Sequence, residues 1–220
     1  MANGFLMPAW FLGYDIIFKL LFAIVTLTIS FYSFKVYSIS RQRSSKLFGI
    51  SFLFFSTSYI IQSALSFAIV SKVNENICTL VKINEVTTLN NIALTTHMVF
   101  FILGLVTLSY MTLKVKSKRT YILLIIISLL SLLLSYNRLY WFYLLSSIYL
   151  IFILYHYSTN YDNKKNVRTL SILIAFGFLL FGHIHFLFVL DHKILYLIGQ
   201  FLELAAYIIF LINLILVLKK

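Results

Sequence analysis

Long apolar runs, separated by short clusters of charged and Asn-rich residues, organise this chain of 220 residues. A bilayer has a hydrocarbon core about 30 Å thick, which a helix of about 20 mostly apolar residues crosses. Seven runs approach or exceed this length, and they cover residues 11–37, 47–70, 89–113, 121–135, 140–157, 170–190 and 194–218. The pattern predicts an all-α, polytopic integral membrane protein whose seven transmembrane helices form a single domain of residues 1–220.

The fourth and fifth runs are short, and only a brief polar break containing Asn137 and Arg138 separates them. A tight helical hairpin is the simplest interpretation of this spacing. Fusing the two runs into one helix would give a span far longer than the bilayer requires. The sequence therefore favours seven spans over six.

Composition agrees with a membrane protein and narrows the classes of function. Hydrophobic residues make up 61% of the chain, charged residues make up 11%, and the mean hydropathy is +0.97. These values exclude an ordinary soluble domain and a disordered chain, and one cysteine excludes a disulfide scaffold. Almost the whole chain is needed to cross the bilayer, so we expect a multi-pass protein of the cell membrane without a soluble catalytic domain.

The net charge of +12 comes mainly from the connections between the runs. Thirteen of the eighteen basic residues lie in the alternate segments 35–46, 114–119, 164–168 and 219–220. Cytoplasmic loops carry such an excess of Lys and Arg, so the bias places the N-terminus outside and the C-terminus in the cytoplasm. These alternate segments, which include the C-terminus, all lie on one side of the membrane and opposite the N-terminus only if the number of spans is odd. The lipid bilayer is the expected partner of this charge, and nucleic acid is not. With no basic segment before the first run and no cleavage site after it, we expect no removable signal peptide.

The longest connection, residues 71–90, is predicted to lie outside. Val73, Ile77 and Leu80 recur at helical spacing, which indicates a short amphipathic helix on the outer surface. The alternation of Val81, Ile83 and Glu85 equally fits a brief extended piece. The lone cysteine, Cys78, lies in this segment and cannot form an intramolecular disulfide.

Polar residues inside the spans provide the candidate chemistry. Ionisable groups within the bilayer are costly, so each one is a hypothesis for a functional site. The candidates share a depth of roughly 9 to 14 Å below the outer boundary, from a rise of 1.5 Å per residue. They are Asp15, Lys19, Gln62, His97, His183, His185, Gln200 and Glu203. We expect them to line an outward-facing polar pocket for a ligand or a proton.

Residues three, four or seven positions apart share a helix face, and several polar residues follow that spacing. One such stripe in the last span consists of Tyr196, Gln200, Glu203 and Tyr207. A structural interpretation competes with the functional one. Asp15 and Lys19 form an i,i+4 pair that can simply neutralise itself, and Ser and Thr stripes usually serve helix packing.

Glu203 is the strongest single candidate, because a lone carboxylate in an apolar helix must be protonated, paired or hydrated. His183 and His185 point about 200° apart on a regular helix, so only one of them faces the bundle. His97, His183 and Glu203 together would suit zinc, and two facing histidines would suit a haem iron. A hydrogen-bonded His/Glu relay without a metal is the preferred alternative.

The segments Phe181–Phe188 (FGHIHFLF) and Ile198–Lys220 (IGQFLELAAYIIFLINLILVLKK) resemble the last two helices of the seven-helix membrane sensor domains that precede histidine kinases and diguanylate cyclases. The resemblance covers about fifty residues. It implies a sensor on a seven-helix scaffold. No kinase or cyclase domain follows in this chain, so the resemblance implies signalling through a separate membrane or cytoplasmic protein.

The leading hypothesis is therefore a non-enzymatic seven-helix protein with an outward-facing polar pocket. It would sense a small ligand, an ion or pH, or serve as a subunit of a larger membrane complex. One alternative is a membrane-embedded, metal-dependent lipid hydrolase that activates a bound water. A second is a small proton-coupled transporter that uses Asp15, Lys19 and Glu203.

Overall fold

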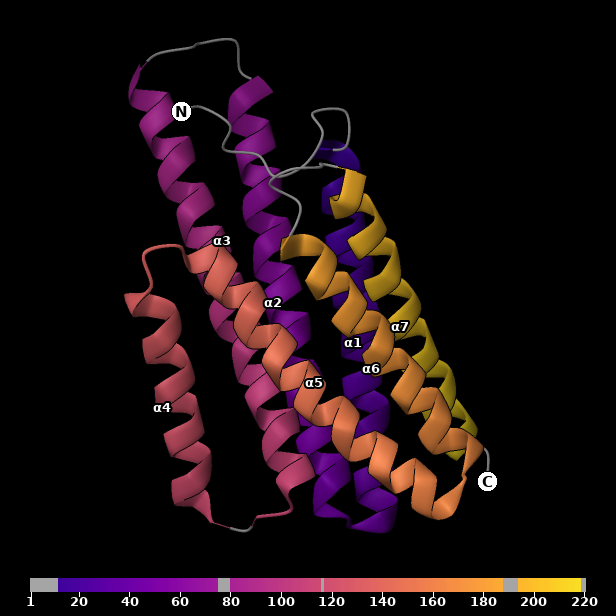
Figure 1. Ribbon diagram of the computed structural model, residues 1–220. Coiled ribbons are helices and arrows are strands. Elements are labelled where there is room, and N and C mark those ends of the chain that lie inside the picture. The colour runs from indigo at the N-terminus through magenta and orange to yellow at the C-terminus, as the bar shows by residue number, and fades with distance from the viewer. Residues whose placement is uncertain (1–11, 75–79, 116, 188–193, 219–220) are drawn as a thin grey trace.

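Seven α-helices follow one another along the chain in the computed structural model, which describes residues 12–74, 80–115, 117–187 and 194–218 (Figure 1). No strand occurs in these residues. The helices are α1 (Leu12–Ser40), α2 (Arg43–Asn74), α3 (Leu80–Leu113), α4 (Lys118–Leu134), α5 (Arg138–Lys164), α6 (Val167–Leu187) and α7 (Ile194–Leu218).

Six of the described helices are long and apolar enough to cross a membrane, and α4 is the exception. The six spans are Gly13–Ser40, Arg43–Ile69, Thr88–Leu113, Arg138–Asp162, Val167–Leu187 and Ile194–Leu218. The prediction of a helical, multi-pass membrane protein is thereby confirmed. At 17 residues, α4 has only the minimum length for a span.

The predicted outer segment 71–90 is mostly not a separate element. Residues 71–74 continue α2 without a break, and residues 80–90 form the first turns of α3. An extended piece at Val81, Ile83 and Glu85 was a wrong prediction, because all three are helical. Continuing a helix satisfies its own backbone hydrogen bonds, which a lone extended segment cannot do. Cys78 lies outside the described residues.

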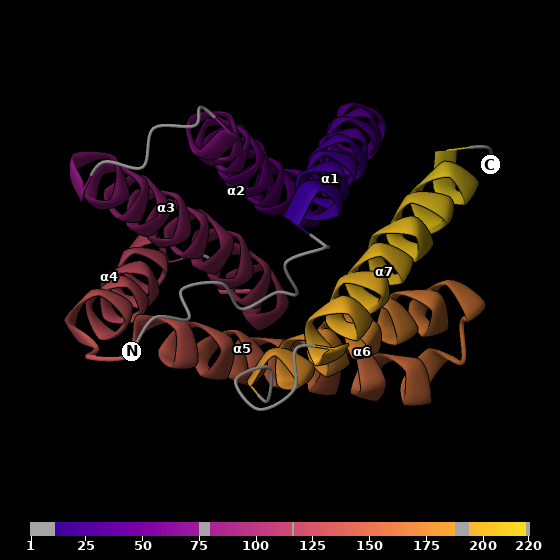
Figure 2. The same cartoon turned by 90° about the horizontal axis from the view of Figure 1, so that it is seen from above.

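Six helices close into a ring, and α4 lies outside it. Neighbours in the ring are α1 and α2, α2 and α3, α3 and α5, α5 and α6, α6 and α7, and α7 and α1. Viewed along its axis, the bundle has these six helices around a common centre (Figure 2). The short helix α4 packs only on α3 and α5, among the described helices. Two hydroxyl contacts hold it there, from Tyr121 to Thr107 at 2.9 Å and from Ser128 to Tyr149 at 2.5 Å.

The lower half of the ring, toward the C-terminal ends of α1 and α7, is filled by aromatic side chains. Phe52, Phe55, Phe176 and Phe210 are completely or almost completely buried, and their rings contact one another in sequence. The backbone of α3 approaches α2 closely at Gly104, where a Cβ would stand 2.4 Å from the Phe55 ring. Glycine is therefore required there for packing.

Two glycines also bring α6 and α7 together beside the polar residues of the upper half. A Cβ on Gly182 would lie 3.2 Å from the carbonyl oxygen of Gly199 and 3.5 Å from Cγ of Glu203. A Cβ on Gly199 would lie 2.6 Å from the Phe186 ring. Gly104, Gly182 and Gly199 therefore all lie at close contacts between helices. Gly177 differs, because its nearest neighbour would be Leu154 at 3.8 Å.

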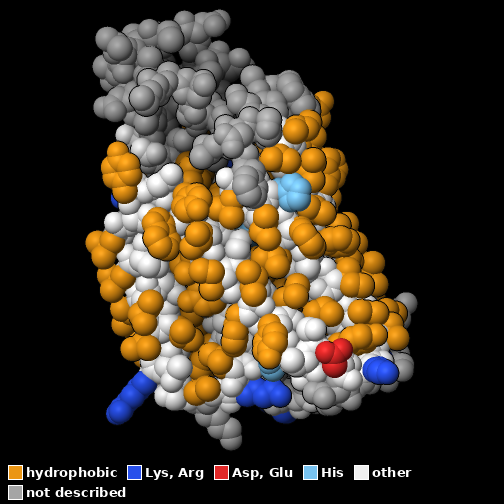
Figure 3. Space-filling view, in the orientation of Figure 1, with side chains coloured by type: hydrophobic (Ala, Val, Ile, Leu, Met, Phe, Trp, Pro, Cys, Tyr) orange, Lys and Arg blue, Asp and Glu red, His pale blue; other side chains and the backbone are white. Residues whose placement is uncertain are grey.

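The side of the bundle is apolar, and Lys and Arg gather along its lower rim (Figure 3). At that end α1, α3 and α5 are each followed by a basic residue in the left-handed conformation: Arg41, Lys114 and Lys165. A positive charge is favourable at a helix C-terminus, because the last carbonyl groups carry partial negative charge. The basic residues that indicated topology in the sequence therefore also cap helices.

Candidate functional site

A cavity of about 110 Å³ lies between the six helices of the ring, in the half of the bundle where α1 begins and α6 ends. Seven of the eight predicted site residues line it: Asp15, Lys19, Gln62, His97, His183, Gln200 and Glu203. This volume has room for several water molecules or a small organic molecule. The sequence patterns thus identified side chains that the fold brings together; that they bind a ligand stays a prediction.

Helical periodicity explains how so many polar groups meet. On α7, Tyr196, Gln200, Glu203 and Tyr207 repeat every three or four residues, and all four are buried in the bundle. Opposite them, Gln62 of α2 and His97 of α3 line the same cavity. The outer face of α7 carries apolar residues such as Ile198, Phe201 and Ile208, which are exposed. The polar face of α7 therefore lies toward the bundle, because the opposite face of the same helix is apolar.

A buried acid–base pair forms one side of the cavity. Lys19 forms an ion pair with Asp15 one turn away on α1, and both side chains are nearly inaccessible, at 7% and 1% exposure. The hydroxyl of Tyr196 donates a hydrogen bond to Oδ1 of Asp15 at 2.6 Å, which links α1 to α7. The Tyr196 side chain is itself buried. Pairing is essential for charges at such depth.

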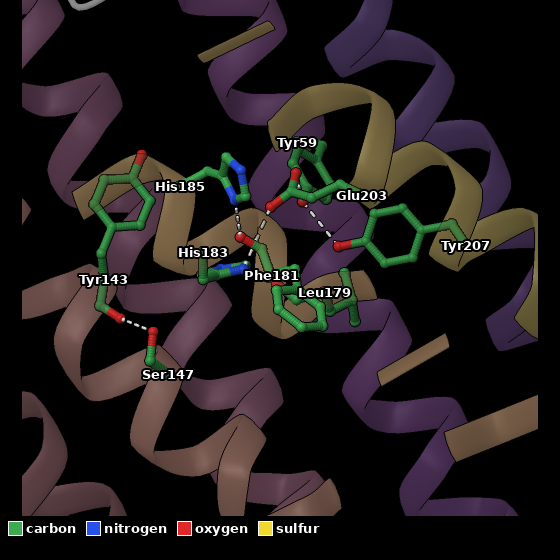
Figure 4. Close-up of polar contacts among 9 residues, drawn as sticks. All are labelled: Tyr59, Tyr143, Ser147, Leu179, Phe181, His183, His185, Glu203 and Tyr207. Carbon is green, nitrogen blue, oxygen red and sulfur yellow. Dashed lines mark hydrogen bonds and ion pairs between the residues drawn. The ribbon is translucent and has the colours of Figure 1, made fainter. Parts of the chain in front are cut away.

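Glu203 of α7 contacts side chains of two other helices, α2 and α6 (Figure 4). Its Oε2 accepts a hydrogen bond from the hydroxyl of Tyr59 at 3.3 Å, and the same hydroxyl lies 2.8 Å from that of Tyr207. Its Oε1 lies 3.6 Å from Nδ1 of His183 on α6. The predicted relay of His and Glu therefore has a geometric counterpart, a chain that runs from Tyr207 through Tyr59 to Glu203 and His183.

His97 belongs to the same cavity but does not meet the other predicted metal ligands. Its Nδ1 lies 2.6 Å from the hydroxyl oxygen of Ser58. The rings of Phe101 and Phe142 each pack against the imidazoles of both His97 and His183. The described residues contain no group of three metal-ligating side chains. His97, His183 and Glu203 thus do not form one ligand set in the described residues, and a zinc site or a haem site at these residues stays a prediction.

His185 is the one predicted site residue that does not line the cavity. It is partly exposed, and its Nδ1 donates to the carbonyl oxygen of Phe181 at 2.7 Å (Figure 4). The helix α6 stays regular through this region, so residues two apart face different directions. His183, at 1% exposure, is the histidine that faces the bundle.

Gln200 lines the cavity and carries an unsatisfied buried group. Its side chain is 6% exposed, and its Oε1 has no hydrogen-bond partner among the described residues. Leaving a buried amide oxygen unpaired costs about 1 to 3 kcal/mol. Such an atom in the wall of a cavity calls for a donor that enters the cavity.

Sequence reasoning missed several residues of the cavity. Tyr59 lies three residues before Gln62 on the same helix face, and this spacing could have identified it. Ser58, which contacts His97, lies four residues before Gln62, so the same helical spacing could have identified it. The contribution of Phe142 and Tyr143 on α5 had no signal in the sequence, because aromatic residues are frequent throughout the spans.

No family model matches the chain, and no curated protein or solved structure matches it either.

Proposed function

We propose that this chain is a non-enzymatic membrane receptor that binds a small polar ligand in the cavity between its helices. The observation that supports the proposal is the combination of Glu203 and Gln200, whose Oε1 is unpaired; both residues are buried and line one cavity. A fold normally pairs its buried polar groups. A cavity that retains unpaired groups is suited to a ligand that completes the pairing.

The proposed receptor has seven spans, with α4 as the fourth. Successive helices of the described chain run in alternate directions, so α1 and α7 both start at the upper end in Figure 1. Exposed Ile122, Ile126 and Leu130 give α4 an apolar outer face that suits lipid. The basic lower rim supports a cytoplasmic location for the end of α7 and an outside location for the start of α1.

A receptor that binds the ligand is favoured over a transporter that moves it through the bundle. Below Glu203, the ring of Tyr207 packs against Phe22 and Phe52, and Phe52 packs against Phe210. This layer of buried aromatic side chains closes the cavity toward the lower end. A transporter reaction would have to open it, whereas a receptor retains it.

The proposed receptor would transmit its signal through α7. Gln200 and Glu203 belong to α7, whose other end lies at the basic rim. A ligand that draws these two side chains together shifts the same helix that reaches the proposed cytoplasmic face. A membrane or cytoplasmic signalling protein would respond to this shift, in agreement with the resemblance of α6 and α7 to sensor domains.

Ligand-induced stabilisation tests the proposal, because a ligand that binds only the folded state raises the melting temperature. The purified protein in detergent is melted with four small probes of different charge: methylammonium, acetate, glycine and acetamide. We expect at least one probe to raise the melting temperature in a saturable way. The effect should be lost in Glu203→Gln or in Gln200→Met.

Asp162→Asn is the matched control, since Asp162 is exposed at the end of α5, outside the cavity. It should respond to the probe as the wild type does. If no probe changes the melting temperature of the wild type, the receptor proposal is wrong. The same conclusion follows if every variant responds equally, because binding would then lie elsewhere.

A further inference from the structure

The directions of the hydrogen bonds around the cavity show which groups remain for a ligand. Tyr59 donates its hydroxyl proton to Glu203, and Tyr196 donates its proton to Asp15. The ammonium of Lys19 is paired with Asp15, so these two charges cancel. These three donors of the wall are therefore engaged with the protein itself.

Both cavity histidines use Nδ1 as the donor. Nδ1 of His183 lies 2.9 Å from the carbonyl oxygen of Leu179, which can only accept. Ser58 donates its hydroxyl proton to the carbonyl oxygen of His97 at 2.9 Å, so the 2.6 Å contact of its oxygen with Nδ1 of His97 is donated by the imidazole. In a neutral imidazole with a proton on Nδ1, Nε2 is an acceptor. Neither Nε2 has a hydrogen-bond partner among the described residues.

Four acceptor atoms of the wall remain for a ligand. They are Oε1 of Glu203, the unpaired Oε1 of Gln200, and Nε2 of His97 and of His183. Glu203 also carries the one carboxylate of the wall that no Lys or Arg balances in the described part of the chain. An entering group that offers several donors and a positive charge is complementary to this set.

Aromatic rings complete the wall. Tyr59, Phe101, Phe142, Tyr143, Phe186 and Tyr196 all line the cavity. The face of an aromatic ring attracts a cation, and the attraction grows when water is excluded. The wall thus combines hydrogen-bond acceptors with surfaces that favour the same charge.

We infer that the ligand of this cavity is a small primary amine, bound as its ammonium ion between Glu203 and Gln200. This inference rests on the proposed receptor function and names its ligand class. An ammonium group with three N–H donors satisfies the acceptors, whereas a quaternary ammonium has no donor to offer. An anion would lie against Glu203 and would leave Oε1 of Gln200 unpaired.

The test compares matched probes on the wild-type protein in detergent. Methylammonium and benzylammonium chloride should each raise the melting temperature by a few degrees at ten times their dissociation constant. Methanol and benzyl alcohol replace the ammonium with a hydroxyl and should give no shift at the same concentrations. Benzyl alcohol also controls for partition of the aromatic group into detergent. All samples contain the same sodium chloride concentration, so the shift reports the ammonium.

Single substitutions test whether the amine binds at Glu203 and Gln200. Glu203→Gln removes the charge but keeps the shape, and should reduce the affinity for methylammonium at least tenfold. Gln200→Met removes the acceptor and should also weaken binding, which keeps the inference testable if Glu203→Gln does not fold. Asp162→Asn should bind as the wild type does.

Other outcomes overturn the inference in distinct ways. If acetate or acetamide stabilises the protein through Glu203 and Gln200 and the amines do not, the receptor proposal stands and the amine class is wrong. If tetramethylammonium matches methylammonium, the rings and not the acceptors select the ligand, so the primary amine assignment fails. Equal stabilisation by added sodium chloride would identify a metal-cation site instead. A lack of any shift would overturn both proposals together.

Discussion

The hydroxyl of Tyr59 lies 3.3 Å from Oε2 of Glu203, although 144 positions separate the two residues in the chain. This contact joins α2 to α7 across the centre of the ring. Tyr207 extends it through its own hydroxyl, 2.8 Å from that of Tyr59. Because Tyr59 donates to the carboxylate, Tyr207 must donate to Tyr59. The carboxylate therefore sits at the accepting end of a directed chain of hydroxyl groups.

Replacing Tyr59 with Phe should destabilise the protein by about 1 to 3 kcal/mol, since it leaves both Oε2 of Glu203 and the Tyr207 hydroxyl without their buried partner. Thermal melting in detergent measures the effect. Tyr155→Phe is the control, because the Tyr155 ring is 68% exposed and should lose nothing measurable. Equal stability of Tyr59→Phe and the wild type would show that the hydroxyl chain does not contribute to the fold.

The pair of Asp15 and Lys19 should behave as one unit. Removing a single partner by Asp15→Asn or Lys19→Met leaves the other charge buried, which costs about 3 to 5 kcal/mol. The double variant should be more stable than the sum of the two losses predicts, by about 0.5 to 3 kcal/mol of coupling. A double-mutant cycle of unfolding free energies checks this, and additive losses would contradict the pairing.

Two glycines on different helices should respond oppositely to alanine. Gly104→Ala places a Cβ 2.4 Å from the Phe55 ring and should cost about 1 to 3 kcal/mol through overpacking. Gly177→Ala meets only Leu154 at 3.8 Å and should be neutral or stabilising by up to about 1 kcal/mol, because alanine favours the helix. Melting temperatures of the two variants compare them directly. Similar losses at both positions would mean that the contact with Phe55 is not the cause.

The orientation is tested by labelling single cysteines in a Cys78→Ser background. Gln42 lies in the exposed turn between α1 and α2, and Asn137 lies in the exposed turn between α4 and α5. With the N-terminus outside and seven spans, an impermeant thiol reagent added to intact cells should label position 137 and not position 42. Labelling at 42 would reverse the orientation. Protection of both positions would remove α4 from the spans.

The sequence by itself determined the class of the protein and the membership of most of the site. Apolar runs of span length require helices in a bilayer, because lipid offers no partner for backbone groups. The spacing of Gln200 and Glu203 on one face, and the shared depth of the polar residues, follow from the 3.6-residue period alone. These properties are local, so they can be read along the chain. The same period indicated that only one of His183 and His185 faces inward.

Only the tertiary structure decided which polar residues pair with which. Nothing local distinguishes Tyr59 from the other tyrosines, and its contact with Glu203 exists because α2 and α7 face each other across the ring. The position of α4 outside the ring, and the phenyl rings that pack against both His97 and His183, likewise depend on how helices meet in space. A sequence pattern fixes the face on which a residue lies. The neighbour opposite that face depends on side-chain packing between helices that are distant in the chain, which no local period encodes.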